Sequence, residues 1–327
     1  MPRQYRIAFW NLENLFDIEG SPQRTEKLAR TLGSSIKGWT QALLDRKIGQ
    51  LAGIIRKMND GRGPDILGIA ETENLYVIEL LVQALAPLGR NYRIVHHDTR
   101  DSRGIDVAFI YDANLFAVPE PLADNVFSHF VMKRTATRDI VHVNFKTVAH
   151  GRLLVLMGNH WPSRKGDEGA SAAYRAMAGE TMAYFHQRVF DIQGKTTPVL
   201  AMGDFNDEPF DASLVDYALA LRSLQQVLKG INPYFLNLMW PLMGQGIGTY
   251  YFDGPIVFDQ FLANKNLLAK DVPLRVVPGS VEILRFPEMV KKGAYPEPIP
   301  FGGMGKPVNQ NGCSDHLPIQ VTLVEAD

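Results

Sequence analysis

Residues 198–206 read Pro-Val-Leu-Ala-Met-Gly-Asp-Phe-Asn, an apolar run that ends at Gly203 and is followed by Asp204 and Asn206. A short apolar run behind a proline predicts a buried strand, and the glycine lets the chain turn sharply as it leaves the sheet. Because side chains two residues apart on an extended chain point the same way, the carboxylate and the amide are expected to converge and hold a water molecule. The alternative interpretation is a Gly-Asp turn in which the Asp side chain bonds its own backbone.

Comparable apolar runs occur along the whole chain, between stretches of helical periodicity. Further strands are predicted over residues 5–10, 65–70, 93–97, 106–111, 140–148, 153–157, 257–263 and 317–324. Helices are predicted over residues 41–58, 77–88 and 170–190, where apolar side chains recur at helical spacing. Several predicted strands follow one another without an intervening helix, so the sequence indicates an α/β protein whose sheets contain antiparallel pairs and are flanked by helices.

Two stretches rich in Gly and Pro interrupt this pattern, at residues 229–254 and 286–312. Loops this long inside a compact domain are usually functional or disordered. We expect both to be insertions that border the site. The alternative is that they are mobile surface loops without a catalytic role.

The charge and the cysteine content restrict the class of protein. Lys and Arg (34) nearly balance Asp and Glu (35), for a formal net charge of −1, so an anionic substrate has to be gripped locally and not by global attraction. The single Cys313 excludes an internal disulfide framework and a thiolate metal site. The N-terminus has no apolar targeting segment, and no stretch reaches the ~18 apolar residues of a membrane span, so a cytoplasmic location is expected.

Polar residues stand where six of the predicted strands begin or end. They are Asn11, Glu71, Asn159 with His160, Asp204 with Asn206, Asp259, and the run Ser314, Asp315 and His316. Six such clusters predict one polar pocket at one edge of the sheets. Oxygen-rich ligand sets suit Mg²⁺, which keeps several waters and leaves positions for phosphate oxygens. Zinc fits less well, since only His160 and His316 offer nitrogen, and the implied chemistry is attack of water on phosphorus.

Five of six short motifs in the chain carry residues from this set, and all six occur in a fixed order: Phe9-Trp10-Asn11-Leu12-Glu13-Asn14, Ile69-Ala70-Glu71, Gly104-Ile105-Asp106-Val107-Ala108, Asn159-His160-Trp161-Pro162-Ser163-Arg164, Gly203-Asp204-Phe205-Asn206-Asp207 and Ser314-Asp315-His316. The series resembles that of the endonuclease/exonuclease/phosphatase superfamily, which includes pancreatic-type DNases, apurinic-site endonucleases, sphingomyelinases and inositol polyphosphate 5-phosphatases. The resemblance implies a four-layer α/β sandwich, with two packed mixed β-sheets flanked by helices. Because residues near both termini build one pocket, a single domain over residues 1–327 is expected.

The resemblance also implies roles for the metal-binding and catalytic residues. Glu71 is expected to be the principal Mg²⁺ ligand, with Asn11 as a ligand or as an orienter of metal-bound water. Asp315 is a second possible ligand, and Mn²⁺ is a plausible substitute ion. Asp204 is expected to accept a proton from the attacking water or to align it, while Asn206 holds that water or a phosphate oxygen.

His316 is expected to donate to the phosphate oxygen on which charge develops, with Asp259 fixing its tautomer. At the position of His160, pancreatic-type DNases carry a His and apurinic-site enzymes carry a Tyr, which favours the DNase and sphingomyelinase side. Phosphate contacts are expected from Asn159, Ser163 and Arg164, since Arg can clamp phosphate through two parallel N–H bonds. For Arg164 the alternative is an exposed turn.

These features predict a Mg²⁺-dependent nuclease or other phosphodiesterase acting on DNA, RNA or short oligonucleotides. The alternatives are a phosphomonoesterase, a sphingomyelinase-like lipid phosphodiesterase, and an inactive member used for binding. The net charge of −1 predicts modest affinity for a long duplex unless bases cluster at the mouth of the site. Candidates for that cluster are Lys133, Arg134, Arg138, Arg164 and Lys165. No protein partner is indicated.

Overall fold

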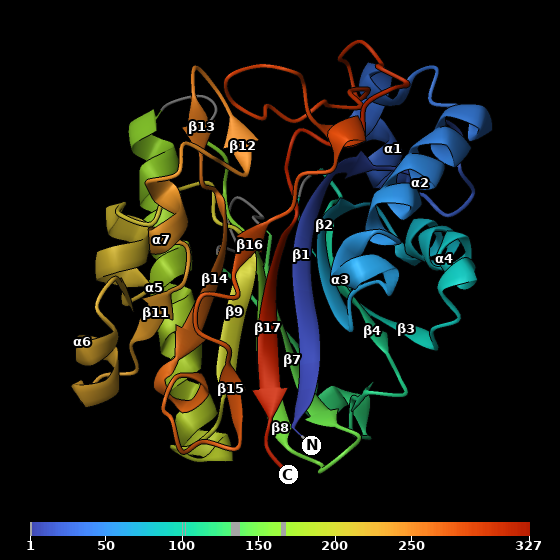
Figure 1. The fold of residues 1–327 in the computed structure, drawn as a ribbon. Helices are drawn as coiled ribbons and strands as arrows, with labels where there is room; N and C mark the ends of the chain where they lie inside the picture. Colours follow the sequence, from blue (N-terminus) through green and yellow to red (C-terminus); the bar gives the residue numbers. More distant parts are fainter. Residues whose placement is uncertain (1, 100, 102, 132–137, 165–167) are drawn as a thin grey trace.

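Two mixed β-sheets pack face to face, with helices on both outer sides (Figure 1). The computed structural model describes residues 2–99, 101, 103–131, 138–164 and 168–327. The sheets approach closely where Gly158 of one faces Val107 and Phe109 of the other. Glycine allows this approach, since a Cβ at that position would lie 2.7 Å from Val107 Cγ1, too close for a side chain. The predicted four-layer α/β architecture is confirmed.

The first sheet joins the two ends of the chain. Its order is β15 (Leu274–Val276), β17 (Ile319–Glu325), β1 (Arg3–Leu15), β2 (Ile66–Thr72), β4 (Asp106–Asp112) and β3 (Tyr92–His96), with β16 (Glu282–Ile283) also paired to β17. Among these pairs β1 and β2 run parallel, and the others are antiparallel. Because the first long strand pairs with the last one, we propose that residues 1–327 form a single domain.

The second sheet contains the apolar run that ends at Asp204. Its order is β10 (Ala220–Leu221), β11 (Phe235–Asn237), β14 (Asp259–Asn264), β9 (Val199–Asp204), β8 (Leu153–His160), β7 (Ile140–Thr147) and β5 (Phe116–Ala117), with β6 (Val126–His129) also paired to β7. A separate hairpin joins β12 (Tyr250–Tyr251) to β13 (Pro255–Ile256). Strands β8 and β9 are parallel, so their carboxyl ends reach the same edge.

The helices divide between the two outer faces. Beside the first sheet lie α1 (Glu26–Leu32), α2 (Gln41–Ile55), α3 (Met58–Gly61) and α4 (Leu75–Ala84); beside the second lie α5 (Glu168–Gln193), α6 (Leu224–Lys229) and α7 (Trp240–Met243) (Figure 1). The side chains of Thr40 and Asn74 begin α2 and α4 by accepting hydrogen bonds from backbone N–H groups in the first turn. The described chain also contains short helical turns, which are η1 (Gly33–Ile36), η2 (Ala86–Leu88), η3 (Leu122–Asp124), η4 (Ser213–Tyr217), η5 (Lys265–Leu267) and η6 (Pro287–Met289). None of the helices in the described ranges is long and apolar enough to cross a bilayer.

One of the two predicted loops is partly regular structure. Residues 229–254 contain β11, which pairs with β14 inside the second sheet, as well as α7 and β12. The predicted loop insertion is therefore regular in part, which the sequence did not indicate, because a strand of only three residues (Phe235–Asn237) is too short to produce a readable alternation. Residues 286–312 contain only η6 and two isolated bridges besides loop, as expected.

Candidate active site

The polar strand ends meet at one edge of the two stacked sheets. His160 ends β8 and lies beside Asp204 at the end of β9, while Asp259 begins β14 and lies opposite Asp204. Asn11 of β1 crosses between the sheets, since its Nδ2 donates a hydrogen bond to Asp204 Oδ2 at 3.0 Å. Glu71 reaches the same place from β2, with Oε1 3.5 Å from His160 Nε2. The strands thus bring residues far apart in the sequence into one site.

Asp204 occupies the centre of this edge and is buried. Its Oδ1 accepts a hydrogen bond from the backbone N–H of Asn206 at 2.9 Å, and its Oδ2 faces His316 Nε2 at 3.8 Å and His160 Nε2 at 3.7 Å. Burial raises the pKa of Asp204 to about 7; the positive charge of His316 opposes this shift and the negative charge of Asp259 adds to it. The carboxylate therefore has one oxygen held by the turn and one directed at two imidazoles.

Asn206 does not project beside Asp204 as two residues of an extended strand would. Strand β9 ends at Asp204, and Asn206 has a left-handed backbone (φ 51°), which turns its side chain so that Nδ2 donates to the backbone oxygen of Trp161 at 3.0 Å. The expectation of convergent side chains was wrong for this reason. The turn interpretation applies to Oδ1 of Asp204, while Oδ2 accepts a hydrogen bond from Asn11 and faces the two imidazoles.

His316 and Asp259 form a buried pair. His316 Nδ1 lies 2.7 Å from Asp259 Oδ2, so Nδ1–H donates to the carboxylate and Nε2 points toward Asp204. Burial by itself would lower the pKa of His316, but the charges of Asp259 and Asp204 raise it well above the usual value. The imidazole is therefore a cation whose Nε2–H can donate to a substrate oxygen.

His160 has the opposite electrostatic character. Burial lowers its pKa well below the usual value, with further lowering from the charges of Arg103 and His316. Its buried Nδ1 has no hydrogen-bond partner in the described part of the chain. The site thus pairs a charged imidazole at His316 with a neutral one at His160, and a second donor or acceptor is available without a second positive charge.

The donor set on the Glu71 side suits a hard divalent cation. Glu71 has a left-handed backbone (φ 65°) and is fixed by the N–H of Asn14, which donates to Oε2 at 2.9 Å. Asp315 keeps a quarter of its side chain exposed, and burial raises its pKa together with the nearby charge of Glu71. Glu71, Asp315 and the amide oxygen of Asn11 are hard oxygen donors of the kind that Mg²⁺ prefers, and a cation would offset the repulsion between these carboxylates.

A cluster of Asp204, Asp259 and His316 also has ligand atoms close enough to hold an ion. The direct 2.7 Å hydrogen bond between His316 Nδ1 and Asp259 Oδ2 uses one possible ligand atom of each residue, so an ion there would compete with this pair. Buried His donors held this way act in proton transfer or in charge stabilisation. Glu71 and Asp315 therefore fit the ion better than this cluster does.

The structure does not support a phosphate contact by Asn159. Its side chain is fully buried; Nδ2 donates to the backbone oxygen of Met157 at 2.9 Å and Oδ1 accepts from Trp161 Nε1 at 3.0 Å. With its donor and acceptor engaged in the interior, Asn159 positions Trp161 after His160. The sequence placed it at the correct strand end but could not show that its side chain points into the core.

Arg164 is engaged by carboxylates within the protein. Its Nη2 lies 2.5 Å from Asp211 and 3.1 Å from Asp207, and its guanidinium stacks over Phe258 at 5.0 Å. Arg138 is buried and lies 3.5 Å from Asp101. These ion pairs reduce the positive charge available for a phosphate. They therefore argue against the predicted phosphate contact of Arg164.

Other predicted phosphate contacts are less constrained. Ser163 is half-buried on the loop after His160, and its phosphate contact stays a prediction. Lys133, Arg134 and Lys165 lie outside the described residues.

Two site residues on the β12–β13 side were not predicted. Thr249 Oγ1 accepts hydrogen bonds from the N–H groups of Phe258 and Asp259, at 3.1 and 3.0 Å, and so fixes the start of β14. The ring of Tyr250 lies 4.9 Å from the His316 imidazole and 5.4 Å from the ring of Phe258. A Thr-Tyr pair ten residues before Asp259 carries no periodic signal, so only the fold reveals it.

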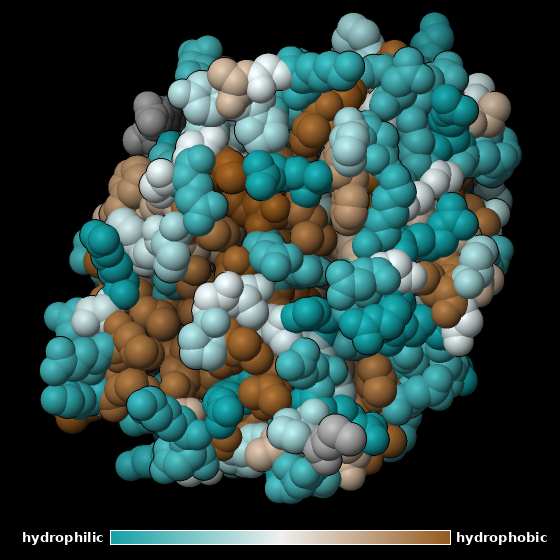
Figure 2. Space-filling view, in the orientation of Figure 1, coloured by the Kyte–Doolittle hydropathy of each residue, from teal (hydrophilic) through white to brown (hydrophobic). Residues whose placement is uncertain are grey.

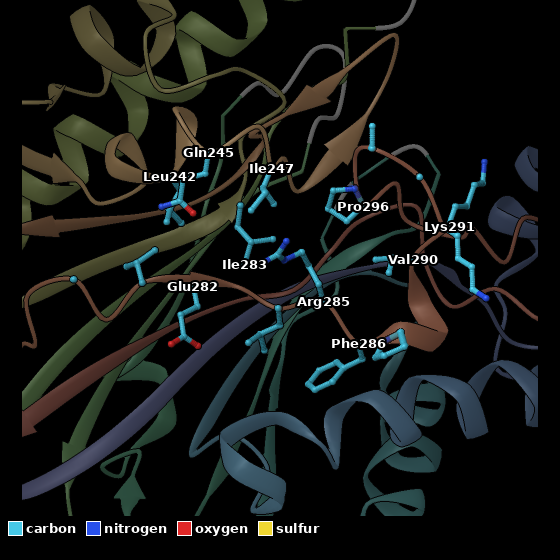
Figure 3. Close-up of a pocket in the computed structure, with 17 residues that line it drawn as sticks. Leu242, Gln245, Ile247, Glu282, Ile283, Arg285, Phe286, Val290, Lys291 and Pro296 are labelled. Carbon is cyan, nitrogen blue, oxygen red and sulfur yellow. The ribbon is translucent and has the colours of Figure 1, made fainter.

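A cavity of about 370 Å³ opens beside Asp315. Its walls are Glu13, Tyr250, Tyr251, Glu297, Pro298, Pro300, Gly302, Lys306, Pro307 and Asn309. The 286–312 loop thus borders the site, as predicted. A larger cavity of about 970 Å³ is lined by Leu242, Ile283 and Arg285 among others, and none of the predicted site residues lines it (Figure 3). On the face shown in Figure 2, apolar surface gathers between α7 and β16, where this cavity opens.

Two stacked mixed sheets with carboxylates, an Asp–His pair and a neutral His at one edge define the class of metal-dependent phosphoester hydrolases. A family model described as "Endonuclease/Exonuclease/phosphatase family" matches residues 6–325. The chain belongs to this family, which confirms the predicted enzyme class. A search of curated protein sequences found no match.

Solved structures show the same fold at low sequence identity. An endonuclease/exonuclease/phosphatase family protein from Bacteroides thetaiotaomicron is 15% identical, with TM-score 0.57 and coverage of 100% of this chain and 99% of the other. D. rerio TDP2 complexed with single-strand DNA product is 15% identical, with TM-score 0.58 and 98% of each chain covered. A mannosyl-6-phosphatase from Bacteroides thetaiotaomicron is also 15% identical, with TM-score 0.56 and coverage of 98% and 99%. These likenesses establish the fold and leave nuclease and phosphatase as alternatives.

Proposed function

We propose that this protein is a Mg²⁺-dependent phosphodiesterase that acts as a nuclease on short or single-stranded nucleic acid. Glu71 is assigned as the principal metal ligand, with Asp315 and the amide of Asn11 completing the oxygen donors. Mg²⁺, or Mn²⁺ in its place, would supply positive charge to the phosphate when bound. The compartment, expected to be the cytoplasm, stays a prediction.

The protein's own residues carry the proton and charge chemistry. Asp204 Oδ2 is assigned as the base that aligns the attacking water, because it faces His316 and His160 beside its hydrogen bond from Asn11, whereas Oδ1 is held in the turn by the N–H of Asn206 at 2.9 Å. The cationic His316 donates through Nε2 to the phosphate oxygen on which charge develops, and Asp259 keeps Nδ1 protonated. His160, being neutral, donates to the phosphate or to the leaving oxygen. Asn206 holds the loop after His160 through Trp161, so its role is to position that loop.

The observation that favours a diester over a terminal phosphate is the neutralisation of nearby arginines. Arg138, Arg164 and Arg175 contact the loops after His160 and Asp204, and within the described ranges each lies within 3.5 Å of an aspartate. A terminal phosphate carries close to two negative charges at pH 7, and a diester carries one. The pairing of these three arginines favours the singly charged group, although Arg103, whose charge acts on His160, and Lys306 near Asp315 add positive charge at the site.

The decisive test is a Mg²⁺-dependent hydrolysis panel with Asp204→Ala as the blank. Plasmid DNA, single-stranded oligonucleotides, bis-p-nitrophenyl phosphate, p-nitrophenyl phosphate and sphingomyelin would be compared at equal enzyme concentration. We expect cleavage of the oligonucleotides and of bis-p-nitrophenyl phosphate, with weak release from the monoester. Cleavage of the monoester alone would overturn the nuclease assignment, and equal activity in the blank would overturn the mechanism.

A further inference from the structure

A buried turn at the end of β1 contacts both the metal-ligand side and the cavity wall. Glu13 and Asn14 both adopt left-handed backbone conformations, with φ of 51° and 59°. Such conformations cost free energy for residues other than glycine, so the surrounding structure has to hold them in place. Neither side chain has a role in the proposed mechanism.

The carboxylate of Glu13 binds the backbone of the proline-rich loop. It is 1% exposed, and its two oxygens accept hydrogen bonds from the N–H groups of Phe301 at 2.6 Å and Gly302 at 3.1 Å. Phe301 and Gly302 lie 288 and 289 residues after Glu13 in the chain. A buried carboxyl group that accepts from two backbone donors is a directional contact, so Glu13 fixes this part of the loop.

Lys47 of α2 holds the same turn from behind. Its side chain is 0% exposed; Nζ donates to the backbone oxygen of Glu13 at 2.6 Å and lies 4.8 Å from the centre of the Phe301 ring. Burying an ammonium group is costly unless it is paired or hydrogen-bonded. Lys47 contacts the turn and also Phe301, the loop residue whose N–H Glu13 binds. The two side chains therefore support the same part of the loop.

The turn at Glu13 and Asn14 also orients the proposed metal ligands. The N–H of Asn14 donates to Glu71 Oε2 at 2.9 Å, and the N–H of Glu13 donates to Asn11 Oδ1 at 3.1 Å. Both bonds depend on the left-handed conformations that Lys47 and Glu13 stabilise. The same turn therefore fixes an oxygen of Glu71 and of Asn11 while its side chain fixes the loop.

The loop segment held by Glu13 forms a wall of the 370 Å³ cavity. Pro300, Gly302 and Lys306 line that cavity together with Glu13 and Asp315. On the other side Phe301 packs edge-on against Trp39, with ring centroids 5.7 Å apart. The wall is thus anchored from the interior by an aromatic contact and from the site by a carboxylate.

We infer that Glu13 and Lys47 are positioning residues that couple the proline-rich wall of the substrate cavity to the orientation of Glu71 and Asn11. This inference rests on the proposed function for its consequence on substrate binding. Its physical content is independent of catalysis: the loop amides and the metal site share one buried support. Loss of that support is expected to loosen both at once.

Hydrogen exchange tests the loop side of the coupling. Glu13→Gln keeps one acceptor but places an NH₂ group against the second backbone N–H, so peptides covering residues 298–309 are expected to exchange at least tenfold faster. Lys47→Met, which keeps the apolar stem, should accelerate the same peptides. Glu288→Gln is the matched control, because that acid lies in the same loop, is exposed and contacts Lys57. Unchanged exchange in both folded test variants would overturn the inference.

Manganese binding tests the metal side without activity. Mn²⁺ affinity, followed by electron paramagnetic resonance, is expected to fall about 10- to 100-fold in Glu13→Gln and Lys47→Met and to stay unchanged in the control. Faster exchange with unchanged Mn²⁺ affinity would overturn the coupling. If the wild-type protein binds no Mn²⁺, the proposed function fails, and the exchange data still decide whether Glu13 and Lys47 hold the proline-rich loop. If Glu13→Gln does not fold, Lys47→Met decides both readouts.

The catalytic consequence separates positioning from general destabilisation. With short oligonucleotides that fill the cavity, KM is expected to rise at least fivefold in Glu13→Gln at saturating Mg²⁺, while KM for p-nitrophenyl diesters stays within about twofold. A uniform loss of kcat on both substrates, with KM unchanged, would show a different role and overturn the inference.

Discussion

The His316–Asp259 pair gives the sharpest test of the chemistry. Nδ1 and Oδ2 lie 2.7 Å apart, and both side chains are buried, with Asp259 at 0% exposure. At an effective dielectric constant of about 20 the attraction between the two charges is about 6 kcal/mol, part of which offsets desolvation. A positioned proton donor typically contributes about 10²- to 10⁴-fold to turnover. Because His316 loses its partner, we expect Asp259→Ala to lower kcat about 10²- to 10³-fold.

The effect should fall on turnover and not on binding, because His316 loses its charge and its orientation while the phosphate-binding groups remain. Asp259→Asn keeps the shape and removes the charge, so its kcat is expected to lie between those of the wild type and Asp259→Ala. The assay is kcat and KM for bis-p-nitrophenyl phosphate with Mg²⁺, with thermal unfolding to confirm folding. Asp253→Asn is the control, since Asp253 is an exposed hairpin residue with φ 53°, a conformation that Asn tolerates.

Two outcomes would refute this reasoning. An unchanged kcat in a folded Asp259→Ala protein would show that the pair has no part in turnover. A large rise in KM with kcat unchanged would show that His316 acts in ground-state binding, since interactions present only in the transition state change kcat.

Three further predictions follow from the site and the core. Glu71→Gln should weaken Mn²⁺ binding at least tenfold, measured by titration, because a charged oxygen donor is replaced by a neutral one. Chelation of divalent ions should abolish hydrolysis, and added Mg²⁺ should restore it without refolding, as checked by circular dichroism before and after. Burial lowers the pKa of His129 to about 3 and of His142 to about 4, so as the pH falls from 6.5 to 4 the unfolded state binds more protons than the folded state and the free energy of unfolding should fall. From pH 7 to 5 each histidine is expected to contribute a loss of about 2 kcal/mol in urea titrations, and the loss should be smaller in a His129→Gln/His142→Gln variant.

The sequence predicted the location of the site because apolar runs fix where strands end. His160, Asp204 and Asp259 follow or begin such runs, and once β8, β9 and β14 pair, their side chains must share an edge. The order of the motifs then selected the fold. Helix and strand bounds were predicted to within a few residues where the runs were long.

The directions of individual side chains could not be predicted in the same way. Asn206 follows a strand, but its left-handed backbone turns it toward Trp161, and Asn159 points into the core to bind the same tryptophan. Glu13 stands two residues from Asn11 in the sequence, yet its partners are almost 290 residues away. Such contacts depend on backbone conformation and long-range packing, which a single sequence does not display.

Arg164 shows how the fold changes the meaning of a motif. In the sequence its place after His160 suggested a phosphate clamp, but its guanidinium lies over Phe258, whose ring stacks on Tyr250, which in turn contacts His316. Because Asp207 and Asp211 hold the guanidinium in place, this column of side chains is supported at the end away from the site. Arg164 is therefore connected to the imidazole of His316 by the rings of Phe258 and Tyr250. In the proposed mechanism Arg164 thus supports His316 by packing, and the phosphate contacts are assigned to His316, His160 and the metal ligands.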